Sequence, residues 1–134
     1  MNIYFIPARA GSKRVPGKNY ALVGGKPLIS YSIDFAISAA KDSDIIVVST
    51  DCPNITNIAS SYGDQIFVDS RSSNLADDTS RMIDVVTDYI SRSNCISNSD
   101  TLTLLQPTTP FRKLNTLSSL FDMFHSYPDL SSVF

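Results

Sequence analysis

The stretch NIYFIPARAGSKRVPGKN, residues 2–19, decides how the chain begins its fold. Its apolar start predicts a buried β-strand over 2–8. Its second half is a loop that contains glycine and no acid, and the loop carries the cations Arg9, Lys13, Arg14 and Lys18. Such a basic loop directly after a buried strand indicates an anion-binding site at the carboxyl end of that strand.

Strand-like and helix-like segments alternate along the rest of the chain. Further strands are predicted over 44–50, 65–69, 101–106 and 129–134. Helices are predicted over 27–40, 54–62, 78–90 and 115–124, with Pro27 in a first helical turn, Gly63 ending the second helix, and Asp78 and Asn115 as caps. This order is typical of βαβ units, so the sequence predicts an α/β protein with a mostly parallel sheet covered on both faces.

Composition and charge narrow the class of protein. The 134 residues are 43% hydrophobic and 18% charged, which suits one globular domain over 1–134. No apolar run approaches the ~20 residues that span a bilayer, so no membrane partner is predicted. Cys52 and Cys95 form no CxxC pair, and two free thiols favour a reducing, cytoplasmic location.

The net charge of −2 is unevenly distributed. Five cations precede the first acid, Asp34. The rest of the chain contains six cations and all thirteen aspartates, and the chain has no glutamate. A short basic segment on an otherwise acidic chain favours a small anion and disfavours nucleic acid as the partner.

The two familiar phosphate-binding loops do not fit the basic loop. The dinucleotide pattern GxGxxG is absent. The P-loop pattern GxxxxGK[ST] fails because five residues separate Gly11 from Gly17, and because Asn19 stands where a hydroxyl residue is needed.

The loop can still bind phosphate by another route. Gly11 permits close approach and unusual backbone dihedrals, and the N–H groups of 10–13 can form an anion nest. Arg9 can bind a phosphate bidentately, while Lys13 and Lys18 act as point charges. The alternative is a solvated basic loop, and we expect Arg14 to be a surface charge. A flavodoxin-like or receiver-like domain is the simplest competing assignment.

Five blocks of the sequence resemble one family. They are IPARAGSKRVPGKN (6–19), GKPLISYSI (25–33), VVSTD (47–51), SRSSNLADDTS (70–80) and LLQPTTPFR (104–112). Together, in this order, they are similar to acylneuraminate cytidylyltransferases, the CMP-sialic acid synthetases. The resemblance implies a three-layer, Rossmann-like nucleotide-diphospho-sugar transferase fold. It also implies a reaction in which CTP and a sialic-acid-like nonulosonate give the CMP-sugar and pyrophosphate, for lipopolysaccharide or capsule biosynthesis.

The resemblance also implies roles for individual residues. The nucleotide-binding residues that it implies are Arg9, Gly11, Ser12, Lys13, Lys18, Asn19, Arg71, Thr79 and Ser80. Lys18 and Arg9 are the implied catalytic residues, because their charge stabilises the phosphates as pyrophosphate leaves. Asn19 is expected to orient the ribose or the base, Arg71 to contact the cytosine, and Thr79 and Ser80 to read its edge. Gln106 is expected to face the sugar.

Several of these residues have a structural alternative. Arg71 can be a surface charge paired with Asp69 or Asp77, and Gln106 can be a buried amide that satisfies the loop backbone. Asp78 can assist the base or cap a helix. Arg112 can meet the sugar carboxylate or cap a helix, Asp51 is expected to stabilise the loop, and His125 to be a surface or packing residue.

The resemblance further implies a Mg²⁺ cofactor and a homodimer. Family enzymes are longer, and their C-terminal part, absent from this chain, carries an Asp-x-Asp pair for Mg²⁺. No such pair follows Gln106, so the metal ligands stay unassigned. Asp42 and Asp44 have that spacing but are expected in a helix-to-strand turn. Two alternative functions therefore remain: a catalytically weak CTP-binding remnant, or a cytidylyltransferase for KDO, legionaminate or pseudaminate.

Overall fold

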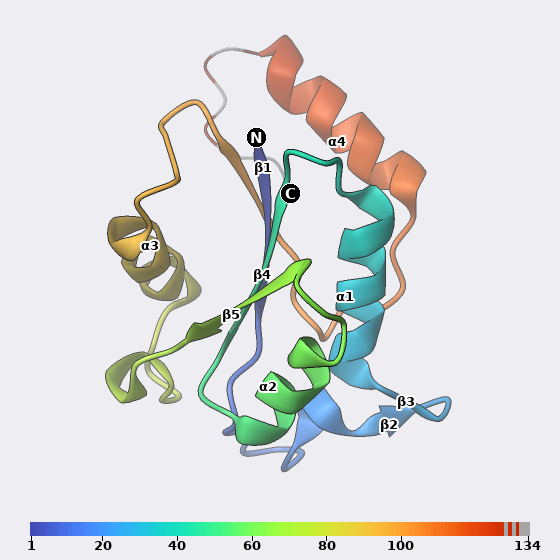
Figure 1. Cartoon of the computed structure of the whole chain (residues 1–134), viewed down its shortest axis with the longest axis vertical. Helices are drawn as coiled ribbons and strands as arrows, with labels where there is room; N and C mark the ends of the chain where they lie inside the picture. Colours follow the sequence, from blue (N-terminus) through green and yellow to red (C-terminus); the bar gives the residue numbers. More distant parts are fainter. Residues whose placement is uncertain (128, 130, 132–134) are drawn as a thin grey trace.

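A four-stranded parallel sheet forms the centre of the protein (Figure 1). The computed structural model describes residues 1–127, 129 and 131. Its strands are β1 (Asn2–Pro7), β4 (Ile45–Thr50), β5 (Ile66–Ser70) and β6 (Thr101–Leu104), in the order β5-β4-β1-β6. The four strands predicted up to residue 106 are confirmed. The strand predicted over 129–134 lies almost entirely outside the described residues.

Helices cover both faces of the sheet and complete three layers, as predicted (Figure 1). On one face lie α1 (Leu28–Ala39), α2 (Pro53–Ser60) and α4 (Leu114–Ser126). On the other face lies α3 (Met82–Arg92). Among the described helices, none is long and apolar enough to cross a membrane.

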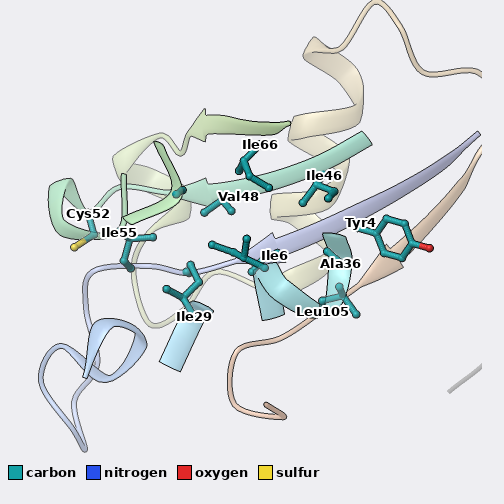
Figure 2. Close-up of a cluster of buried hydrophobic side chains, with 13 residues drawn as sticks. Tyr4, Ile6, Ile29, Ala36, Ile46, Val48, Cys52, Ile55, Ile66 and Leu105 are labelled. Carbon is teal, nitrogen blue, oxygen red and sulfur yellow. The ribbon is translucent and has the colours of Figure 1, made fainter. Parts of the chain in front are cut away.

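The main core lies between the sheet and the helices α1 and α2. Because side chains alternate along a strand, Tyr4 and Ile6 of β1 point to this face while Ile3 and Phe5 point to the other. Figure 2 shows Ile6 and Val48 of the sheet facing Ile29 and Ile55 of the helices. Burying one such side chain contributes about 1.5–3 kcal/mol, so this layer fixes the positions of the strand ends.

A smaller cluster lies under α3. Ile3, Phe5 and Val47 pack there against Val85, the buried residue of that helix. Partly buried neighbours, Tyr89 among them, complete the cluster, and the rings of Phe5 and Tyr89 lie 5.2 Å apart. The start of α3 is therefore held against the sheet close to the carboxyl ends of the strands.

A short hairpin after the first loop was not predicted. It pairs β2 (Leu22–Val23) with β3 (Lys26–Pro27) and follows the 3-10 turn η1 (Lys18–Tyr20). Gly24 and Gly25 form its turn with φ values of 60° and 79°, as a primed hairpin turn requires. Pro27 ends β3 and precedes α1, so its predicted place within the first helical turn is wrong.

The predicted caps of two helices are also wrong. α3 begins after Arg81 and α4 after Lys113, and neither Asp78 nor Asn115 caps a helix. Asp78 instead forms ion pairs described below. Gly63, with φ of 81°, lies two residues beyond the C-cap of α2, Ser61.

The turn before β4 has the structure expected from its aspartates. Asp44 accepts hydrogen bonds from the amides of Asn2 (2.8 Å) and Lys41 (2.9 Å), which fixes the passage from α1 into β4. The prediction that Asp42 and Asp44 belong to a helix-to-strand turn is confirmed.

The two cysteines are free, with Cys52 buried and Cys95 exposed.

Candidate functional site

A cleft of about 230 Å³ lies at the carboxyl ends of the parallel strands. Three loops form it: the blue loop after β1, the loop after β5, and the segment after β6 (Figure 1). Its lining residues are Pro7, Arg9, Lys18, Asn19, Arg71, Leu75, Asp77, Asp78, Ser80, Met82, Val85, Gln106, Pro107 and Thr108. This is where open α/β sheets place their ligands.

Two side chains hold the basic loop in place. The amide of Ala10 donates to Oδ1 of Asp51 (2.7 Å), which ties the loop to the end of β4. The buried Asn19 donates from Nδ2 to the carbonyl of Arg9 (3.1 Å), which closes the loop on itself. The prediction that Asp51 stabilises the loop is confirmed. The left-handed glycine of this loop is Gly17, with φ of 65°, whereas Gly11 does not use the unusual dihedrals that a glycine permits.

Arg71 is a buried cation at the floor of the site. Arg71 directly follows β5, and its side chain donates from Nη2 to the carbonyl of Ser49 (3.1 Å), with Nε 3.5 Å from the Ser49 hydroxyl oxygen. Burial lowers the pKa of Arg71, and the nearby carboxylates of Asp51 and Asp69 partly oppose that shift. The alternative of a surface charge paired with Asp69 or Asp77 is wrong.

Ser49 holds Arg71 in place, and Asp69 in turn holds Ser49. The Ser49 hydroxyl donates to Oδ2 of Asp69 (2.8 Å), and Oδ1 of Asp69 pairs with Arg92 on α3 (3.0 Å). The polar residues at the end of β4 therefore act behind the cleft. Ser49 holds Arg71, Thr50 accepts from the amide of Cys52, and Asp51 holds the basic loop.

The loop after β5 is organised by Asp77. Its Oδ1 accepts from the amides of Thr79 (3.0 Å) and Ser80 (2.8 Å) and from both of their hydroxyls. These bonds, led by the Ser80 hydroxyl, lower the pKa of Asp77. Of the two residues predicted to read the cytosine edge, Ser80 lines the cleft, whereas Thr79 is not among the lining residues.

Asp78 joins the two loops across the cleft. Its Oδ1 lies 2.6 Å from Nη2 of Arg9, and its Oδ2 lies 2.9 Å from Nζ of Lys13. Lys13 first, and then Arg9, lower the pKa of this carboxyl. The sequence gives no signal of this contact, because the partners are more than sixty residues apart in the chain.

Gln106 belongs to the third wall, and Arg112 holds the segment that carries it. Gln106 is exposed and lines the cleft, so the alternative of a buried structural amide is wrong. Arg112 donates to the carbonyl of Gln106 and to the hydroxyl of Ser32 on α1 (3.0 Å). Burial lowers its pKa. Arg112 therefore holds this segment against α1 and does not cap a helix.

The structure brings six of the predicted site residues to the cleft: Arg9, Lys18, Asn19, Arg71, Ser80 and Gln106. Gly11, Ser12, Lys13 and Thr79 lie outside its lining, although Lys13 reaches it through Asp78. An apolar wall of Leu75, Met82 and Val85 was missed as part of the site. Wall and core side chains share one sequence pattern, so no signal separates them.

The described residues offer no metal centre. Among them, no group of three His, Cys or Asp side chains is placed to hold an ion. His125 lies in α4, where Nδ1 contacts the Phe121 carbonyl (2.7 Å), and it lines a separate groove at the opposite edge of the sheet. This agrees with the prediction that His125 is a surface or packing residue.

Comparison with known proteins assigns this fold and cleft to a family. The cytidylyltransferase family model matches residues 3–128. The chain belongs to the cytidylyltransferase family. It is 46% identical over 113 residues to the CMP-N,N'-diacetyllegionaminic acid synthase of Legionella pneumophila, covering 84% of this chain and 48% of that protein. It is 34% identical over 126 residues to the N-acylneuraminate cytidylyltransferase of Streptococcus agalactiae, covering 93% and 29%.

A solved structure confirms the fold of this cytidylyltransferase chain. CMP:2-keto-3-deoxy-manno-octonic acid synthetase, solved in complex with CTP, is similar with a TM-score of 0.70 and 23% identity. The match covers 96% of this chain and 49% of that one. The chain thus spans about half the length of this structure and of the Legionella relative, and less of the streptococcal one.

Proposed function

We propose that the cleft binds CTP and serves the transfer of CMP to an acidic nonulosonate sugar, with release of pyrophosphate. The observation that carries this proposal is the gathering of Arg9, Lys18 and the buried Arg71 around one cleft at the carboxyl ends of the strands. Membership of the cytidylyltransferase family supports it.

The triphosphate would lie against the basic loop. We name Arg9, Lys13 and Lys18 the phosphate cations. The amides of Gly11 and Ser12 lie on the same loop, and open space around Gly11 leaves room for close approach. When the anomeric hydroxyl of the sugar attacks the α-phosphorus, the bond to the bridging oxygen of the β-phosphate breaks and charge builds on the leaving pyrophosphate. Lys18 and Arg9 would stabilise that charge.

The other walls suit the base and the sugar. Arg71 is rigidly held and presents a planar set of donors, which fits the carbonyl oxygen of cytosine. The apolar wall that contains Leu75 and Met82 would flank the ring, and Ser80 would read its edge. Asn19 would orient the ribose, while the exposed amide of Gln106 would bind sugar hydroxyls from the opposite wall.

Three further parts of the proposal come from the sequence. Magnesium is implied by the family resemblance, but the described residues supply no ligand cluster, so the mechanism above uses no metal step. A homodimer is supported by two strongly exposed apolar side chains, Leu22 (70% exposed) and Phe111 (78% exposed). A cytoplasmic location is consistent with the two free cysteines.

Two measurements test the proposal. Calorimetric titration of CTP should give a Kd between about 1 μM and 1 mM, that is about −8 to −4 kcal/mol. Absence of both heat and a thermal shift would contradict CTP binding, and equally tight binding of ATP would contradict selectivity for cytosine. Pyrophosphate release should then be followed with CTP, Mg²⁺ and either legionaminate, N-acetylneuraminate, pseudaminate or KDO. Pyrophosphate release that depends on a nonulosonate supports transfer. If CTP binds but none of the four sugars leads to pyrophosphate release, the binding-only alternative is supported.

A further inference from the structure

An acid, Asp78, sits on the cations that the proposed function assigns to phosphate. Each of its oxygens contacts a different cation, Arg9 at 2.6 Å and Lys13 at 2.9 Å. A phosphate group presents its oxygens to two cations in the same way. The Asp78 carboxylate therefore occupies the position that an anionic ligand needs at these two side chains.

The carboxylate is held there by the structure of its own loop. The preceding residue, Asp77, fixes the backbone through its bonds to Thr79 and Ser80. On the other side, Asp51 and Asn19 fix the loop that carries Arg9. The Asp78 side chain remains 34% exposed, so a ligand in the cleft can reach the ion pairs and replace it.

We propose that Asp78 is an internal counter-anion that competes with the phosphates of the nucleotide for Arg9 and Lys13, and so sets the affinity of the site for polyphosphate. The inference rests on the proposed function, since it takes these cations to be the phosphate site. In the empty protein Asp78 holds the two cations at the cleft. On binding, the triphosphate replaces the carboxylate, and Asp78 turns to solvent.

If Asp78 competes with the ligand, removing its charge should raise the affinity for polyphosphate, whereas most mutations in a binding site lower affinity. Asp78→Asn removes the competing charge with little change of shape, so it should strengthen binding. Exposed ion pairs of this kind are individually weak, which gives an expected gain of roughly threefold to tenfold. The matched control is Asp64→Asn, which removes one negative charge from an exposed position at the opposite end of β5.

The experiment is calorimetric titration of inorganic tripolyphosphate and of CTP into the full chain, in magnesium-free buffer of low ionic strength. Asp78→Asn should bind tripolyphosphate more tightly than the unmodified chain, and Asp64→Asn should change its affinity less than twofold. Unchanged or weaker tripolyphosphate binding by Asp78→Asn would overturn the inference, because Asp78 would then support the ligand. Asp78→Ser, expected to behave alike, replaces the Asn variant should the latter lose cooperative thermal unfolding.

A double variant tests the cause of the gain. If Asp78 acts by competing for Lys13, then adding Asp78→Asn to Lys13→Met should give a smaller gain than adding it to the unmodified chain. An equal gain in both backgrounds would overturn the competition mechanism. Failure of the proposed function is separately visible: tripolyphosphate binding that tightens in Asp78→Asn, without any CTP binding, removes the nucleotide assignment and leaves the counter-anion in place.

Discussion

The two edges of the sheet differ in how their charged side chains are used. The groove at the amino edge is the larger, about 700 Å³ against about 230 Å³ for the cleft at the carboxyl edge. At the amino edge Asp44 is taken up by two backbone amides, and Asp100 by the Ser97 amide and the Met1 ammonium. At the carboxyl edge Arg9 and Lys18 face the cleft.

The acids of the amino edge are bonded to the chain's own backbone, whereas the cations Arg9, Lys18 and Arg71 of the carboxyl edge line a cleft. The charges of the amino edge hold the chain together, and removing them should change stability. The charges of the carboxyl edge are held in place by other residues, and removing them should change binding. Each variant below separates these two outcomes.

The largest expected effect on binding is at Arg71. Arg71→Met keeps the apolar stem but removes the donors, and a lost hydrogen bond from a charged group costs about 1.5–3 kcal/mol. We expect CTP affinity to fall roughly tenfold to a hundredfold by calorimetry. The control is Lys41→Met at the amino edge, which should leave the affinity unchanged. Equal CTP affinity of the two variants would contradict a role for Arg71 in CTP binding.

The next effect, on stability, is at Asp44. Asp44→Ala leaves the amides of Asn2 and Lys41 without their acceptor, and we expect a loss of about 1–2 kcal/mol in the free energy of unfolding. CTP affinity should not change. Asp42→Ala, an exposed acid in the same turn, is the control and should unfold like the unmodified chain in urea. A loss of CTP affinity in Asp44→Ala would contradict the assignment of Asp44 to stability alone.

A smaller effect on binding is expected at Asp51. Asp51→Ala frees the Ala10 amide and loosens the basic loop without removing a cation. We expect CTP affinity to fall about fivefold, the effect of one modest hydrogen bond. Titration beside Asp64→Asn as the charge control measures this. An affinity equal to that of the control would show that the bond from Ala10 to Asp51 does not contribute to CTP binding.

The smallest effect is a pH dependence at the amino edge. The Ser97 amide, followed by the Met1 ammonium, lowers the pKa of Asp100 below its ordinary value of 3.8. The carboxylate therefore adds stability above about pH 4, and this stability is lost as the pH falls through the lowered pKa. Asp100→Asn should lower the Tm by a few degrees at pH 7. The difference in Tm should shrink below pH 4, and a constant difference would contradict this origin.

Much of the fold follows from local pattern. The run predicted as a strand over 44–50 forms β4 at Ile45–Thr50, because β-branched residues suit a buried strand. The hairpin of β2 and β3 escaped prediction although Gly24-Gly25 is a hairpin signal, because two-residue strands show no periodicity. The cap predicted at Asp78 failed because ion pairs with Arg9 and Lys13 occupy that carboxylate. The cap predicted at Asn115 failed because α4 already begins at Leu114.

The sequence predicted only part of the site, because several of its contacts join residues that are far apart in the chain. The density of cations before residue 20 marks the basic loop without knowledge of the fold. The burial of Arg71 depends on Ser49 and Asp69, which reach it only when β4 and β5 pair. The contact between Asp78 and two distant cations likewise arises only in the folded chain.

The most direct test of the account is CTP binding by the chain in which Lys13 and Lys18 are both replaced by alanine. We expect the affinity to fall at least tenfold, because two of the three phosphate cations are gone. A chain with Lys41 and Lys113 replaced by alanine loses the same net charge elsewhere and should keep its affinity. Equal CTP affinity in the two double variants would contradict the claim that the basic loop binds the phosphates.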